Sequence, residues 1–209
     1  MNCKTMRVLG MAAAILMCGT MVQTVAHAQM GAAQKAKAKV ATATGEVEPP
    51  SVVYGQMLKM LSSQVIGAAE AMPADKYDFA PTTGNFSGVR TFGAEVQHLA
   101  QANYYFFSGF GLSGAPDEAK LKALKGKDEL VQTLKDSFEY AQKGIDTITP
   151  ENAFTVIGTG PANIKFTRAG AASFCLAHSM DHYGQMVEYL RLNGIVPPAS
   201  QKQSQRASD

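Results

Sequence analysis

The strongest constraint on the fold of this 209-residue chain is an apolar repeat in its second half. Apolar residues recur at steps of four, four, three, four and three positions: Leu130, Leu134, Phe138, Ala141, Ile145 and Ile148. This spacing follows the turn of an α-helix, whereas a strand would place residues an odd number of positions apart on opposite faces. The segment is therefore predicted to be an amphipathic helix with one face in a helical core.

Three further segments show helical patterns. A first helix is expected over about residues 51–71, and a second runs from a Thr91 cap to about residue 108. A fourth is expected over about residues 163–193, because Gly194 provides a glycine stop. The apolar stripe of the first helix is predicted to contain Val53, Met57, Met60, Leu61, Gln64 and Val65. The predicted fold class is all-α, a four-helix bundle with long crossover connections.

The connections between these helices are long for a bundle. About eighteen residues separate the first two helices, and a similar number separate the last two. Simple up-and-down bundles use shorter turns, so some sequential helices are expected to be parallel or diagonal neighbours. A short β-pair around residues 153–158 is also compatible with the sequence.

The first 28 residues have the pattern of a secretory signal peptide. Lys4 and Arg7 precede an apolar run, and Ala-His-Ala at 26–28 forms a small-x-small cleavage motif. The apolar run is too short for a comfortable membrane span, so no membrane association is expected after cleavage. The mature chain is expected to begin at Gln29 and to be periplasmic or secreted.

The remaining chain divides into three parts by composition. Residues 29–50 are rich in Ala, Lys and Thr and are predicted to be a flexible linker. Residues 51–196 have a length that suits one helical domain. Residues 197–209 are polar and are predicted to be a disordered tail.

Removal of the signal peptide changes the charge balance. Of 19 basic residues two leave with the signal, so 17 remain to balance 17 acidic ones. A nucleic-acid partner is not expected, because such proteins normally carry a clustered basic excess that neutralises phosphates.

The cysteines restrict the redox chemistry of the mature chain. Cys3 and Cys18 also leave with the signal, so Cys175 cannot form an internal disulfide and is predicted to be a small core residue. Lipidation at Cys18 is an alternative to simple cleavage, but Met17 before it is larger than the residue that lipidation sites require.

The three histidines of the mature chain suggest a metal site. His178 and His182 are four residues apart, so both side chains lie on one face of a helix, and His98 could complete the site from another helix. Three neutral nitrogen ligands leave a coordination position open. Zinc suits these ligands best, with nickel or iron as alternatives. The pair alone is also compatible with two partly buried histidines that form hydrogen bonds with neighbouring groups.

Side chains three residues from the histidines could orient the rings. Glu95 precedes His98 by three, Gln101 follows it by three, and Gln185 follows His182 by three. Each could hold the second ring nitrogen of a ligand, or each could face solvent.

These residues resemble a known family. The segment His178-Ser-Met-Asp-His182-Tyr-Gly-Gln185 is similar to the last helix of DinB-family proteins, and His98 within VQHLAQANYYF resembles the earlier histidine of that family. The resemblance runs from about Val52 to Pro198. It implies a four-helix bundle with unusual connections and a divalent metal held by the three histidines. Many members have another histidine where this chain has Asp181.

Two function classes remain open. The resemblance implies a metal that activates a low-molecular-weight thiol, as in thiol-dependent transferases or isomerases, although those relatives are cytoplasmic. The first hypothesis is an exported metal-dependent thiol transferase or hydrolase that acts on a small molecule. The alternative is a non-catalytic stress-response or binding module whose metal is structural or absent. A homodimer is compatible with either.

Overall fold

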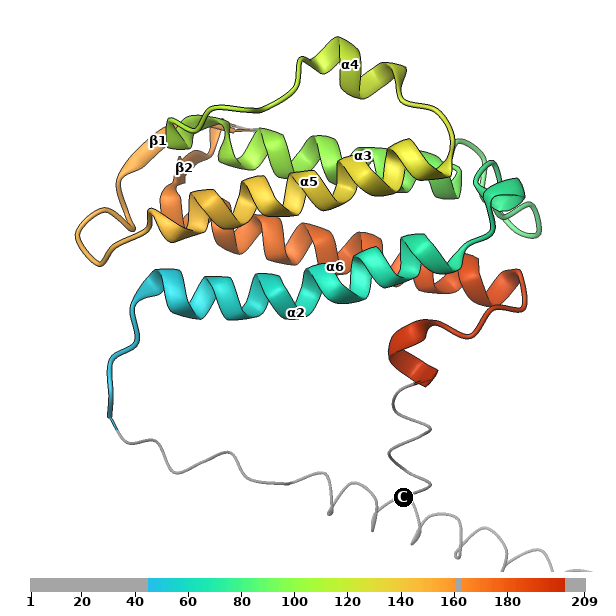
Figure 1. Ribbon diagram of the computed structural model, residues 1–209, viewed down its shortest axis with the longest axis horizontal. Coiled ribbons are helices and arrows are strands. Elements are labelled where there is room, and N and C mark those ends of the chain that lie inside the picture. The colour runs from blue at the N-terminus through green and yellow to red at the C-terminus, as the bar shows by residue number, and fades with distance from the viewer. Residues whose placement is uncertain (1–44, 161–162, 202–209) are drawn as a thin grey trace, which may run out of the picture. The chain divides into compact units, whose positions relative to one another are not determined.

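The computed structural model describes residues 45–160 and 163–201, so the predicted signal peptide and most of the predicted linker lie outside it. Four long helices form the domain, as predicted for an all-α bundle (Figure 1): α2 (Pro50–Ala71), α3 (Phe92–Phe107), α5 (Lys127–Asp146) and α6 (Arg168–Leu192). The shorter elements are η1 (Ala74–Lys76), η2 (Ser108–Phe110), α4 (Glu118–Ala123), β1 (Val156–Thr159) and β2 (Lys165–Thr167).

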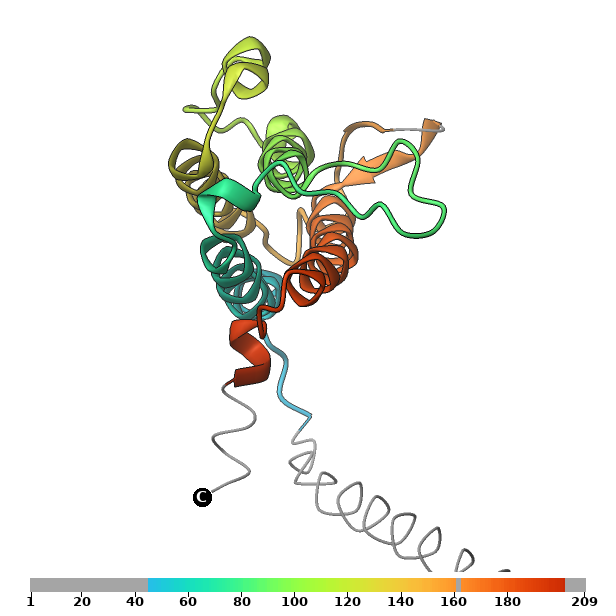
Figure 2. The same cartoon turned by 90° about the vertical axis from the view of Figure 1, so that its right-hand side faces the viewer.

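The four long helices form a ring of neighbours. Helix α3 packs against α5 and α6, and α2 packs against the same two helices from the other side (Figure 2). Helices α2 and α6 run in one direction along the bundle, and α3 and α5 run in the other (Figure 1). The sequential pairs α2/α3 and α5/α6 are therefore diagonal, as the long connections predicted. The segment that returns along the bundle is residues 108–126, which contains α4 and joins the parallel helices α3 and α5.

Helix ends follow the local sequence. The Thr91 side chain accepts a hydrogen bond from the Ala94 amide, which confirms the predicted cap of α3. Gly194 has a φ of 73° after the end of α6, and the Ile195 amide returns to the carbonyl of Leu190.

The start of α6 differs from the prediction. The helix begins at Arg168 rather than near residue 163, because residues 165–167 pair with β1 in an antiparallel hairpin. The Thr167 hydroxyl then caps α6 by accepting from the Gly170 amide. The β-pair that the sequence allowed around residues 153–158 lies at 156–159 and 165–167.

The buried face of α2 agrees with the predicted stripe only in part, because Leu61 and Val65 are buried as predicted. Val53, Met57 and Met60 are exposed, with 62% of Met60 accessible to solvent. The residues that α2 buries are Leu58, Leu61, Val65, Ala68 and Ala69. This set is displaced by about a quarter turn from the larger methionines, because small alanines allow α2 to approach α5 and α6 closely.

The ordered domain extends beyond both predicted limits. Helix α2 begins at Pro50, and residues 198–201 form a further helical turn within the segment predicted as a disordered tail. Pro197 is buried there, and Pro198 lies over Gly67 of α2. Within residues 45–160 and 163–201, no helix combines the length and the apolar character needed to cross a membrane.

Two helical glycines give opposite predictions for stability. A Cβ at Gly144 of α5 would lie 2.4 Å from the ring of the fully buried Phe107, whereas a Cβ at Gly184 of α6 would meet nothing within 4 Å. Gly144→Ala should lower the free energy of unfolding by about 1–3 kcal/mol through overpacking. Gly184→Ala should raise it by about 0.5–1 kcal/mol, since alanine favours helix. Urea unfolding of both variants checks the pair, and equal changes would contradict the packing described.

Candidate metal centre

The structure brings the three predicted histidines together. His98 comes from α3, and His178 and His182 come from successive turns of the neighbouring helix α6. One nitrogen of each ring lies within 4.8 Å of the others. The ring centroids are 5.1 Å apart for His98 and His178, 4.8 Å for His98 and His182, and 4.4 Å for His178 and His182. Three nitrogens thus converge on one point from two helices.

A buried carboxylate fixes one of these rings. Glu95 is 2% exposed, and its Oε2 lies 2.5 Å from Nδ1 of His182. An ionised carboxylate only accepts hydrogen bonds, so the His182 proton resides on Nδ1 and leaves the Nε2 lone pair free. The other oxygen of Glu95 lies 3.6 Å from the Arg90 guanidinium. Burial alone would raise the pKa of Glu95, but hydrogen bonding to His182 and the positive charge of Arg90 outweigh it and lower the pKa.

The environment keeps the other two rings uncharged. Burial, together with the neighbouring rings of His182 and His98, lowers the pKa of His178 to about 4. Burial and the nearby Arg90 also lower the pKa of His98. Near neutral pH both imidazoles therefore present lone pairs rather than positive charge, which is the state that metal coordination requires.

These residues fit a divalent metal. Nε2 of His178 is buried, and within residues 45–160 and 163–201 it has no hydrogen-bond partner. A buried polar nitrogen without a partner is unfavourable unless another group satisfies it. Three imidazoles, one of them held by a carboxylate, form a donor set typical of zinc and related ions.

The remaining candidates near the histidines have other roles. Gln185 donates to the exposed carboxylate of Asp181, at 3.3 Å, rather than to a ligand ring. Of the three side chains that could have oriented a ring, Glu95 is the one that contacts one of the three histidines in the described part of the chain. The sequence spacing placed it beside His98, but it binds His182 from across the helix pair.

Cys175 is a core residue, as predicted. Its thiol is buried and donates to the amide oxygen of Asn103 on α3, at 3.3 Å. Asn103 in turn donates to Ser137 of α5. Burial raises the pKa of Cys175 to about 12, so this thiol is not a nucleophile at neutral pH.

Aromatic rings adjoin one side of the site. Phe106 of α3 meets the His178 ring edge-on at 5.3 Å, and Phe174 of α6 is stacked with it at 6.2 Å. Phe107 is fully buried, while Phe106 is buried and also contacts a ligand ring.

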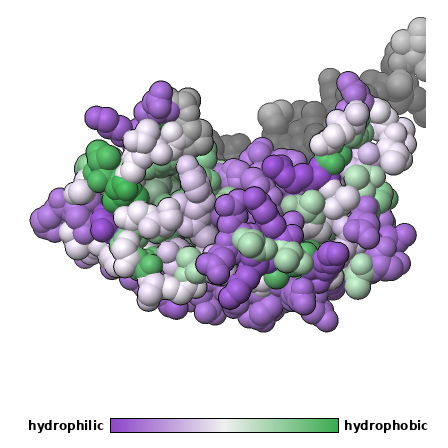
Figure 3. All heavy atoms as spheres, turned by 90° about the horizontal axis from the view of Figure 1, so that it is seen from above, coloured by the Kyte–Doolittle hydropathy of each residue, from purple (hydrophilic) through white to green (hydrophobic). Residues whose placement is uncertain are grey.

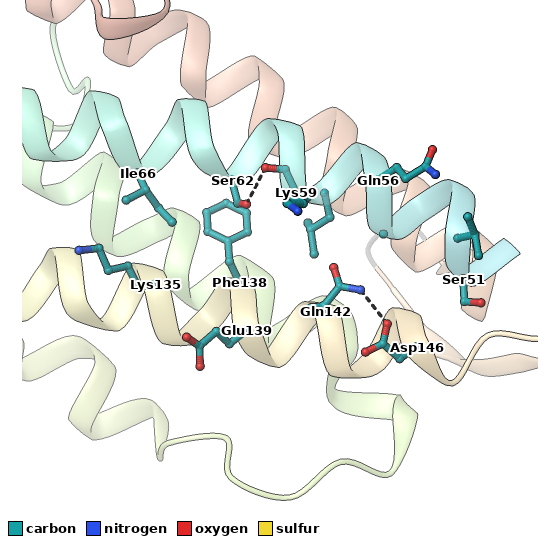
Figure 4. Close-up of a pocket in the computed structure, with 13 residues that line it drawn as sticks. Ser51, Gln56, Lys59, Ser62, Ile66, Lys135, Phe138, Glu139, Gln142 and Asp146 are labelled. Carbon is teal, nitrogen blue, oxygen red and sulfur yellow. Dashed lines mark hydrogen bonds between the residues drawn. The ribbon is translucent and has the colours of Figure 1, made fainter.

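Cavity size alone would have indicated a different site. A groove of about 790 Å³ lies between α2 and α5, on the opposite face of the bundle from α3 and α6 (Figure 4). Leu58 and Phe138 are its buried apolar residues, and Lys59, Lys135 and Glu139 lie on its more polar walls. No histidine or cysteine is among its lining residues.

The depressed histidine pKa values predict a pH-dependent stability. The pKa of His178 is about 4 when folded and about 6.5 when unfolded, so between these values the unfolded chain binds a proton that the folded chain does not. Stability of the metal-free protein should therefore fall as pH drops from 7.5 to 5. Thermal unfolding at stepped pH measures this. His178→Gln should flatten the profile, and an unchanged slope in that variant would contradict the assignment.

Comparisons with known proteins agree with this architecture. The sequence profile of the DinB superfamily matches residues 57–186. No curated protein matches the chain. A DinB-like protein from Bacillus subtilis is 16% identical, with a TM-score of 0.53 over 68% of this chain and 92% of that one. A DinB-like protein from Bacillus cereus is 16% identical, with a TM-score of 0.56 over 69% and 93%. A conserved protein from Enterococcus faecalis is 15% identical, with a TM-score of 0.54 over 70% and 98%.

At these identities the solved structures establish the fold alone. The profile match, however, covers most of the helical domain and includes all three converging histidines. The chain therefore belongs to the DinB superfamily.

Proposed function

We propose that this protein is an exported metal-dependent enzyme that binds one divalent ion through His98, His178 and His182 and transfers a small thiol. The observation that carries the proposal is the convergence of three histidine rings from α3 and α6, of which His178 has a buried nitrogen with no hydrogen-bond partner among the described residues. Zinc is the proposed ion because imidazole nitrogens suit it, with nickel and iron as alternatives.

A divalent ion held there supplies Lewis acidity, which lowers the pKa of a thiol or water that reaches it. The protein's own residues prepare the site before anything binds. Burial keeps His98 and His178 uncharged, and Glu95 holds the proton of His182 on Nδ1. His98 and His178 therefore need to lose no proton before an ion binds, and the His182 ring is already oriented.

The carboxylates around the site favour thiol transfer over hydrolysis. Hydrolysis normally uses a general base within reach of the attacking water. Glu95 is engaged with His182 and Arg90, so it positions a ligand and is not free to take a proton from substrate. Asp181 is exposed and accepts from Gln185. A thiol whose pKa has been lowered needs no such base, because the thiolate itself is the nucleophile.

Metal analysis of protein purified without a histidine tag tests the proposal. One equivalent of zinc, nickel or iron per chain is the expected result, together with activity in a panel of thiol-transfer assays. Protein that binds no divalent metal under any loading condition would overturn the proposed function. Protein that holds one metal but is inert towards thiol-transfer and hydrolysis panels would instead favour the non-catalytic binding module.

Export makes a separate prediction about the mature chain. The basic start, the apolar run and Ala-His-Ala at 26–28 should direct cleavage before Gln29. The intact mass of protein recovered from outside the cytoplasm should match residues 29–209. A recovered species that retains residues 1–28, or one lipidated at Cys18, would show that this processing is wrong.

A further inference from the structure

A cluster of three phenylalanines extends the metal site towards the hairpin. Phe106 of α3, Phe166 of β2 and Phe174 of α6 meet one another with ring centroids 5.2 to 6.4 Å apart. The phenylalanine cluster, defined by these three residues, also contacts His178 through Phe106 and Phe174. An apolar strip therefore begins directly beside a metal ligand.

The sequence positions of these residues explain their alignment. Phe174, His178 and His182 follow one another at steps of four on α6, so Phe174 lies one turn beyond the ligands on nearly the same face. Phe106 lies two turns beyond His98 on the antiparallel helix α3. Both helices thus carry a phenylalanine to the same side of the histidines.

The hairpin fixes the third ring at the end of this strip. A Cβ at Gly109 would lie 2.6 Å from the carbonyl oxygen of Ile157, so the absence of a side chain there lets β1 pack against η2. Phe166 stands opposite Gly158 in the β1/β2 register. A small cavity of about 110 Å³ adjoins Phe106 and Phe166, with Ile157 in its lining.

The opposite side of the histidines is polar. Arg90 and Glu95 lie beyond His182, and the Arg90 side chain is 46% exposed. The site is therefore asymmetric, with charged groups at one end and apolar rings at the other. Hydrophobic surface gathers at the left-hand end of the face seen from above, where Figure 1 places the hairpin, and hydrophilic surface lies beside it (Figure 3).

Burial within the cluster is incomplete. Phe106 is only 8% exposed, but 46% of Phe174 is accessible to solvent, although its ring is stacked with a ligand ring. Core phenylalanines are normally buried, and exposed apolar surface beside a polar site commonly marks a binding surface. We propose that the phenylalanine cluster binds an aromatic group of the substrate while the head group of the same molecule reaches the metal. This inference rests on the proposed function and adds the substrate class.

Two hydroxamates that differ only in their substituent test the inference. Zinc-loaded protein is titrated with benzohydroxamate and acetohydroxamate, and the affinities are measured by calorimetry. Phe174→Ala should weaken benzohydroxamate about tenfold, because it removes stacking and apolar contact area from the ring. Acetohydroxamate should change less than about twofold, and Phe174→Leu should restore part of the loss. Phe154→Ala is the matched control, since Phe154 is 81% exposed and is not part of the cluster.

The metal content of every variant separates the two proposals. One outcome would overturn the aromatic subsite and leave the proposed function intact. In that outcome the Phe174→Ala variant keeps the wild-type metal content, the wild-type affinity for acetohydroxamate and the wild-type affinity for benzohydroxamate. Absence of metal or of binding by both hydroxamates in the wild-type protein would overturn the proposed function and the subsite with it.

Discussion

Replacing His98, His178 or His182 with alanine is expected to lower the affinity for zinc by about a thousandfold, which corresponds to about 4 kcal/mol. Each ring contributes one of three nitrogens that lie within 4.8 Å of one another, so each loss leaves a two-ligand site. The three single variants should be similarly weak. A second replacement should add less than the first, because the site is already broken. Competition with a metal-binding dye measures the affinities.

Gln101→Ala is the matched control for these variants. Gln101 lies on α3 one turn from His98 and is half-buried, but it is not among the three converging residues. This variant should keep the wild-type affinity for zinc. Two outcomes would contradict a shared three-histidine site. One is that the losses of zinc affinity caused by the histidine replacements add independently. The other is that the Gln101 variant loses as much zinc affinity as the histidine variants do.

Replacing Glu95 with alanine is expected to lower the affinity for zinc by about 10- to 100-fold. The substitution removes the acceptor that holds the Nδ1 proton of His182, so the ring loses its fixed orientation and part of its basicity. Glu95→Gln keeps an acceptor oxygen without the charge, so it should lower the affinity for zinc less than Glu95→Ala does. The same dye competition measures the affinities, and circular dichroism checks that both variants remain folded.

Gln185→Ala separates this role from a general effect of polar residues near the site. Gln185 follows His182 by one turn of α6, yet its amide donates to Asp181 instead of to a ligand. Its removal should change the affinity for zinc by less than about threefold. A loss as large as that of Glu95→Ala would mean that Gln185, and not Glu95 alone, supports the ligand rings.

The features that the sequence predicted correctly are local in origin. The apolar repeat between Leu130 and Ile148 identified α5, and the Thr91 cap identified the start of α3. The relation between His178 and His182 also follows from the sequence, because the helical turn alone places residues four apart on one face. In each case neighbours along the chain determine the geometry.

The face that α2 buries could not be read from its sequence. The predicted stripe joined Met57 and Met60 to Leu61 and Val65, although Leu58 continues an apolar spacing as well. Packing against α5 and α6 selects the Leu58 face instead, because alanines on that side allow close contact between helices. The sequence allowed a β-pair around residues 153–158 but did not identify β2, since the short segments of β1 and β2 gain their pairing from each other rather than from a repeating pattern.

The candidate metal centre likewise combines local and tertiary features. The sequence by itself determined the pair on α6 and the helical fold that carries it. Only the tertiary structure decided that His98 meets this pair, that Glu95 rather than Gln101 or Gln185 holds a ligand ring, and that Phe166 joins Phe106 and Phe174. The physical reason is that helical geometry fixes positions within one helix, whereas the meeting of α3, α6 and the hairpin depends on how the whole core packs.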